Sequence, residues 1–116
     1  MALQKIIALP NSASGNYIKV GAFTWDVLTR ESSCHLMLFA SAAAAASAPA
    51  APLAMIGKLR LNGAKFDQYL STAALAALPS PGPDPIRDQL YAAAKAEPLV
   101  PGAGLTAIDL SDATDV

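Results

Sequence analysis

The residue types that most often build an active site are scarce in this chain. Its 116 residues include one cysteine, Cys34, and one histidine, His35. A single cysteine excludes an intrachain disulfide, and no spaced set of cysteines and histidines is present to bind zinc. In a strand, these adjacent residues point to opposite faces and cannot pair as a nucleophile and its base. We expect no enzymatic activity, no metal site and no cofactor.

Long apolar runs are also absent. A membrane-spanning helix needs about 20 mostly apolar residues, whereas the alanine- and proline-rich segment 40–52 is shorter and is interrupted by Ser47 and Pro49. Near the amino end, the apolar residues 6–9 are too few for a signal peptide. We therefore expect neither membrane insertion nor a targeting segment.

Aromatic residues make up only 6% of the sequence and charged residues only 15%. The hydrophobic share of 53% excludes an extended disordered chain. Much of that share is alanine, however, which buries little apolar area per residue. The length suits one compact domain over residues 1–116. Such a domain would have a thin core, and this favours stabilisation by partner subunits.

The net charge of −1 hides an uneven distribution. Residues 1–65 contain six basic and two acidic residues, whereas residues 66–116 contain two basic and seven acidic residues. Opposite fields can steer two copies into head-to-tail contact, although ordinary surface charge gives the same counts. No dense basic cluster is interleaved with aromatic residues, so we expect no nucleic-acid partner.

Alternating apolar and polar residues predict strands over residues 4–9, 17–25, 32–39 and 53–61. Strict alternation in the second segment places Ile18, Val20 and Ala22 on one face, opposite Tyr17, Lys19, Phe23 and Trp25. In the fourth segment it places Met55, Leu59 and Leu61 opposite Ile56, Lys58 and Arg60. Residues 40–52 connect two strands and can form a short helical turn that prolines end. Because the segment lacks a large apolar anchor, we expect this connection to be mobile or loosely docked.

Apolar positions recur at helical spacing in the second half, which predicts a helix over residues 64–78. After a proline-rich break, Asp84 and Pro85 begin a second helix that ends near Ala96. Residues 105–110 are a candidate edge strand. The acidic tail, residues 109–116, is expected to be solvated, because it lacks the ligand series of an EF-hand. We predict an α+β fold with a small antiparallel sheet or sandwich-like core packed by one or two C-terminal helices.

The order of several segments resembles a known group of proteins. These segments are MALQKIIALP, NYIKVGAFTW, HLMLFASAAAAASAPAAPLAMIGKLRLNG, IRDQLYAAAKAEP and SDATDV. Their layout is similar to that of small, mostly uncharacterised virion proteins of tailed bacteriophages, encoded near tail or fibre genes. The prolines between Leu78 and Ile86, and the glycines before the acidic tail, depart from that layout. The resemblance implies a virion component that is made in the host cytoplasm and has no known catalytic site.

We therefore expect a non-enzymatic structural subunit of a phage particle, such as a tail, neck or fibre-attachment adaptor or a decoration protein. Its partners would be other phage structural proteins and copies of itself, with no small-molecule substrate. The alternative is a small regulatory or inhibitory protein-binding module that acts in the host cell.

The candidate interface residues are Tyr17, Trp25, Lys58 and Arg60. Trp and Tyr bury large areas while keeping a polar contact, and Arg is enriched at interface hot spots. A second interpretation places Trp25 in the core of the subunit and leaves Lys58 and Arg60 on a solvated strand face.

Overall fold

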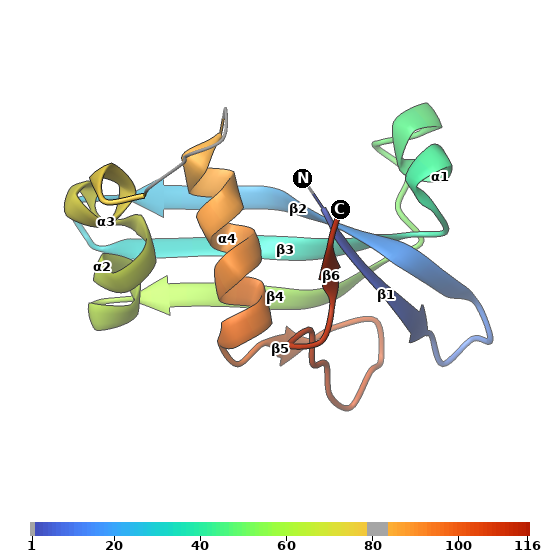
Figure 1. Ribbon diagram of the computed structural model, residues 1–116. Helices are drawn as coiled ribbons and strands as arrows, with labels where there is room; N and C mark the ends of the chain where they lie inside the picture. Colours follow the sequence, from blue (N-terminus) through green and yellow to red (C-terminus); the bar gives the residue numbers. More distant parts are fainter. Residues whose placement is uncertain (1, 79–83) are drawn as a thin grey trace.

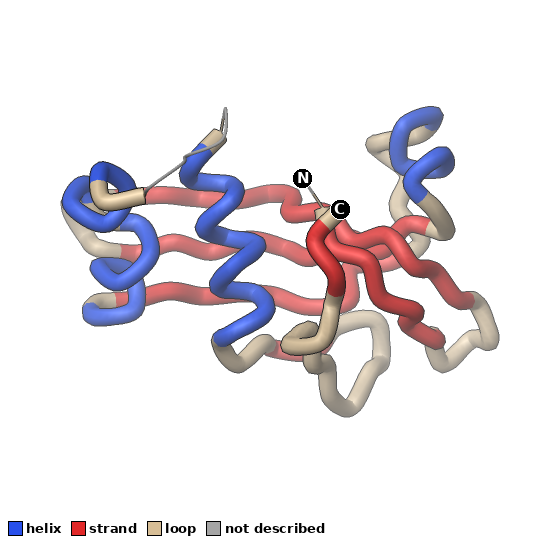
Figure 2. Tube along the Cα trace, in the orientation of Figure 1, coloured by secondary structure: helices blue, strands red, loops and turns tan. Residues whose placement is uncertain are grey.

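A computed structural model describes residues 2–78 and 84–116, which fold around an antiparallel sheet (Figures 1 and 2). Within these residues, six strands lie in the order β5-β4-β3-β2-β1-β6. They are β1 (Leu3–Ala8), β2 (Ser14–Asp26), β3 (Glu31–Phe39), β4 (Ala54–Asn62), β5 (Val100–Pro101) and β6 (Thr114–Asp115). All neighbouring strands run antiparallel, and helices accompany the sheet. The predicted α+β class is confirmed.

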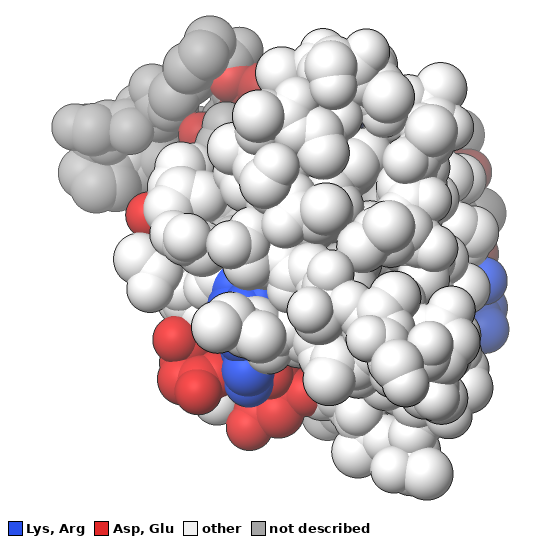
Figure 3. All heavy atoms as spheres, turned by 90° about the vertical axis from the view of Figure 1, so that its right-hand side faces the viewer, with Lys and Arg blue, Asp and Glu red and all other residues white. Residues whose placement is uncertain are grey.

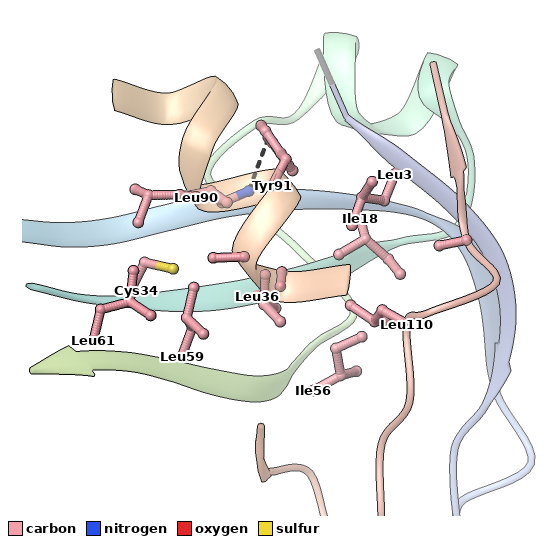
Figure 4. Close-up of a cluster of buried hydrophobic side chains, with 14 of the residues drawn as sticks. Leu3, Ile18, Cys34, Leu36, Ile56, Leu59, Leu61, Leu90, Tyr91 and Leu110 are labelled. Atoms are coloured by element: carbon pink, nitrogen blue, oxygen red, sulfur yellow. Dashed lines mark hydrogen bonds between the residues drawn. The ribbon is translucent and has the colours of Figure 1, made fainter. Parts of the chain in front are cut away.

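The longest of the described helices covers one face of the sheet (Figure 1). The described helices are α1 (Ala42–Ser47), α2 (Ala64–Leu70), α3 (Thr72–Ala76) and α4 (Pro85–Ala96). Helix α4 crosses β2, β3 and β4, while α2 and α3 lie at one end of these strands (Figure 1). The core between the sheet and α4 includes Ile18, Cys34, Leu36, Leu59, Leu61, Leu90 and Tyr91 (Figure 4). Burying each large aliphatic side chain stabilises the fold by about 1.5–3 kcal/mol.

Helix α4 begins where the sequence predicts. The Asp84 carboxylate accepts a hydrogen bond from the Arg87 backbone N–H at 3.1 Å, and Pro85 occupies the first helical position. This pairing satisfies one of the N–H groups that lack a partner at the start of a helix. A proline-rich break is predicted before this helix. Its residues 79–83 lie outside the described residues.

Side chains of α4 also complete the hydrogen bonding of β2. The last residue of β2 that pairs with β1 is Ile18, so β1 leaves the following residues of β2 without a strand on that side. At Val20, the Tyr91 hydroxyl accepts the backbone N–H at 2.9 Å (Figure 4), and the Arg87 guanidinium donates to the backbone C=O at 2.9 Å. These contacts satisfy backbone groups that would otherwise lack a partner.

A β-bulge in β2 changes the face on which its later residues lie. Gly21 pairs with His35 and Thr24 pairs with Ser33, so β2 has one residue more than β3 in this interval. Ala22, with φ of 49°, lies in the bulge. The prediction from strict alternation is therefore wrong here. Because one extra residue inverts the alternation, Ala22 is exposed, while Phe23 and Trp25 lie on the face of Val20.

A second bulge lies in β4. Leu36 pairs with Gly57 and Met37 pairs with Met55, which leaves Ile56 as the extra residue. Ile56 is fully buried in the core, and Met55 lies on the opposite face of the sheet. The prediction had these two side chains reversed. The predicted placement of Leu59 and Leu61 opposite Lys58 and Arg60 is correct, because the bulge precedes those residues.

The helix predicted over residues 64–78 is interrupted at Ser71. This residue has an extended backbone, with φ of −65° and ψ of 158°, and it separates α2 from α3. Its hydroxyl oxygen accepts the Ala74 backbone N–H at 3.1 Å, and its hydroxyl O–H donates to the Asp67 C=O at 2.8 Å. Serine competes in this way with the regular hydrogen bonds of a helix, so local capping outweighs the apolar periodicity.

The connection over residues 40–52 contains the expected short helical turn. Helix α1 begins after Ser41, whose hydroxyl oxygen accepts the Ala44 backbone N–H at 3.1 Å. The chain returns to the sheet where the Leu53 N–H donates to the Leu38 C=O at 2.8 Å.

The carboxyl end is more ordered than a solvated tail. Its strand β6 pairs with β1, and Leu110 and Ala113 are buried, although the aspartates around them are exposed. The strand proposed at residues 105–110 is wrong, since the added strands are β5 and β6. The apolar residues of this end anchor it to the core.

Candidate docking surface

The face of the sheet opposite α4 is formed by alternate residues of β2, β3 and β4. Directly paired residues of antiparallel strands place their side chains on the same face. The pairs on this face include Tyr17–Phe39, Lys19–Met37, Met37–Met55, His35–Lys58 and Ser33–Arg60. We use the name open sheet face for Tyr17, Lys19, Ser33, His35, Met37, Met55, Lys58 and Arg60. No described helix crosses the centre of this face (Figure 1).

The open sheet face combines apolar and cationic side chains. Tyr17, Met37 and Met55 are half-buried, and Arg60 is exposed. An antiparallel sheet commonly leaves one face to water, so exposure alone does not identify a binding surface. Methionine adapts to irregular contacts, however, and Tyr, Met and Arg are enriched at protein interfaces. The face therefore carries three residue types that are enriched at protein interfaces.

The distribution of ion pairs distinguishes this face most clearly. Five ion pairs form among residues 2–78 and 84–116, and their basic members are Lys5, Arg30, Lys65, Arg87 and Lys95. The other three basic residues, Lys19, Lys58 and Arg60, have no carboxylate within 4.0 Å in this part of the chain. All three lie on the open sheet face. The nearest acidic residues along its strands are Asp26 and Glu31, which lie opposite each other in the strand register at the hairpin end of β2 and β3.

The opposite charges of the two halves partly neutralise each other within one chain. Lys5 pairs with Asp112 and Lys65 pairs with Glu97, both at 2.7 Å, and Arg30 pairs with Asp67. The Lys5 ammonium donates a hydrogen bond to Asp112 and lowers the pKa of that carboxyl. Figure 3 shows basic and acidic atoms lying together at one end of the molecule. The field available for head-to-tail steering is therefore smaller than the sequence counts indicate.

Three of the four candidate interface residues share the open sheet face: Tyr17, Lys58 and Arg60. Trp25 does not, because the bulge in β2 directs it to the helix-covered face. Its indole N–H donates to the Leu70 C=O at 3.3 Å, and its ring centroid lies 6.5 Å from that of Phe66. Trp25 therefore links β2 to α2, although 38% of it stays exposed.

Five residues of the face were not among the candidates: Lys19, Ser33, His35, Met37 and Met55. Alternation already placed Lys19 beside Tyr17, so a sequence signal for it existed. No sequence signal existed for Met55, because the bulge in β4 moves its side chain to the face of the sheet opposite the predicted one.

Cys34 and His35 lie on opposite faces, as their adjacency in a strand predicts. Cys34 is fully buried beneath α4, and burial raises the pKa of its thiol to about 11. His35 lies on the open sheet face between β2 and β4. The chain therefore does not bring these side chains together.

Cys34 should resist alkylation in the native protein. A thiol with a pKa of about 11 is deprotonated in only about one molecule in a thousand at pH 8, and burial also blocks the reagent. Iodoacetamide treatment followed by mass spectrometry should show almost no modification in buffer. In concentrated urea, one modification per chain should form rapidly. Equal rates in both conditions would contradict the buried position.

Within the residues described, no helix combines the length and apolarity needed to cross a membrane. The same residues contain no group of three or more His, Cys, Asp or Glu side chains arranged to hold a metal ion. No family model, curated protein or solved structure matches the chain.

Proposed function

We propose that the protein is a non-enzymatic structural subunit of a phage particle, acting as a tail, neck or fibre-attachment adaptor or as a decoration subunit. Its open sheet face would dock onto an acidic surface of a neighbouring structural protein. The observation that carries the proposal is that Lys19, Lys58 and Arg60 all lie on that face, and these are the three basic residues without a carboxylate partner among residues 2–78 and 84–116.

The charges and the apolar side chains would contribute to docking in different ways. Unpaired cations attract an acidic surface over about 8 Å at physiological ionic strength and mainly increase the association rate. Met37, Met55 and Tyr17 would then exclude water at the centre of the contact and slow dissociation.

The dimensions of the molecule are sufficient for such a contact. A standard interface covers about 800 Å² on each partner, which corresponds to a square roughly 28 Å on a side. The protein extends 43 × 28 × 25 Å, so one broad face can supply this area.

Reversing two charges on the open sheet face should block incorporation into particles. The variant K58E/R60E replaces attraction by repulsion without creating a core cavity, so the isolated subunit should stay folded. We expect incorporation to fall at least about tenfold, because electrostatic steering changes association rates by 10- to 1,000-fold. The measurement is quantitative mass spectrometry of purified particles, with thermal unfolding as the check on folding.

The matched control is K58R/R60K, which changes the same two positions and keeps both positive charges. It should enter particles in nearly normal amounts. Normal incorporation of a verified K58E/R60E variant would rule out the open sheet face as the contact. Absence of the wild-type protein from clean particles would overturn the structural role itself and favour the regulatory or inhibitory module.

A further inference from the structure

A pocket lies at the margin of the open sheet face, where the connection over residues 40–52 meets the sheet. Its volume is about 310 Å³. Met37 and Phe39 line it from β3, and Pro49 and Pro52 line it from the connection. Proline has a fixed φ and cannot donate a backbone hydrogen bond, so this part of the lining is stiff and apolar. The connection is held against β3 by the hydrogen bond from Leu53 to Leu38.

Two cations line the same pocket. Lys19 reaches it from β2 and Arg87 from α4, and none of its nine lining residues is acidic. Arg87 is held in place, because it donates to the Val20 C=O and to the Asp84 carboxylate, and its guanidinium carbon lies 5.3 Å from the centroid of the Phe23 ring. Lys19 has no ion pair in the part of the chain that the structure describes. The pocket thus joins an apolar lining to one fixed and one unpaired positive charge.

We infer that this pocket binds a small monocarboxylate with an unbranched apolar chain. The carboxylate would pair with Lys19 beside Arg87, and the chain would lie against Met37, Phe39 and the two prolines. With about 30 Å³ for each water-sized group, the volume suits roughly ten non-hydrogen atoms, which is the size of octanoate. The inference goes beyond the proposed function and does not depend on incorporation into particles.

Titrating the isolated protein with octanoate tests the site. In protein labelled with ¹³C on the methionine methyl groups, the Met37 methyl resonance should shift and reach saturation. Met55, its cross-strand neighbour outside the lining, should shift less. The expected Kd is about a few millimolar or tighter for ten non-hydrogen atoms. Shortening the chain to hexanoate should weaken binding about fourfold for each methylene group removed.

The charge requirement is tested with matched variants and a matched ligand. Lys19→Met keeps an apolar chain but removes the ammonium, and it should raise the octanoate Kd about tenfold to a hundredfold. Lys58→Met removes a cation from the same sheet face outside the pocket and should change the Kd less than about twofold.

In the wild-type protein, 1-octanol should bind at least about tenfold more weakly than octanoate, a comparison that needs no variant to fold. Absence of a saturable Met37 shift would overturn the site. Equal binding of octanol and octanoate, or unchanged octanoate binding in a folded Lys19→Met protein, would overturn the carboxylate assignment.

Discussion

Replacing Leu36 with alanine should lower the free energy of unfolding by about 2–5 kcal/mol. Leu36 is fully buried on the central strand β3, beneath α4 (Figure 4). The substitution removes apolar contacts and leaves a cavity that close-packed neighbours fill only in part. Since small domains are stable by only about 5–15 kcal/mol, this loss would remove a substantial part of the total stability.

Leu28→Ala provides the matched control for this experiment. It makes the same substitution in the turn between β2 and β3, where Leu28 is 91% exposed. Its effect should stay within about 0.5 kcal/mol. Urea denaturation followed by circular dichroism measures both variants. Equal losses in the two variants would show that β3 is not the centre of the core.

Replacing Tyr91 with phenylalanine should cost about 1–3 kcal/mol of stability without opening a large cavity. The ring is retained, but the buried Val20 N–H loses the hydroxyl that accepts it at 2.9 Å. No strand can take over, because β1 does not extend beyond Ile18. The cost is therefore the desolvation of an unpaired backbone donor.

Tyr17→Phe is the comparison for Tyr91→Phe. Within the described part of the chain, the Tyr17 hydroxyl forms no hydrogen bond, and the side chain is only half-buried on the open sheet face. Its removal should change stability by less than about 0.5 kcal/mol. Amide hydrogen exchange at Val20 gives a second measurement, which should accelerate in Tyr91→Phe and not in Tyr17→Phe. Unchanged exchange in both variants would contradict the assigned contact.

The sequence predicted the parts of this fold that depend on local patterns. Alternation identifies β1 to β4, and Asp84 followed by Pro85 marks the start of α4, because capping and strand alternation are properties of neighbouring residues. The two bulges have no comparable signature. Ala22 adopts a positive φ that alanine rarely adopts, and nothing around Ile56 indicates that β4 gains a residue there.

The candidate surface was predictable to the same extent. Lys58 and Arg60 follow the second bulge, so their shared face could be read from alternation, whereas Trp25 follows the first bulge and was misplaced. The lack of ion pairs at Lys19 within the described part of the chain was not predictable, since pairing partners such as Lys5 and Asp112 are brought together only by the fold. The pocket likewise needs α4 and the connection over residues 40–52 to meet β2 and β3.

The side chains that cap Val20 also bear on how the protein avoids aggregation. An unpaired strand edge can recruit a strand from another chain and begin uncontrolled polymerisation. Here a recruited strand would first have to displace Tyr91 and Arg87 from the backbone of Val20, and would then meet the irregular register at Ala22. Bulges of this kind are among the devices that blunt sheet edges. At this edge, the side chains of α4 and the bulge in β2 therefore oppose strand exchange between copies of the chain without covering the open sheet face.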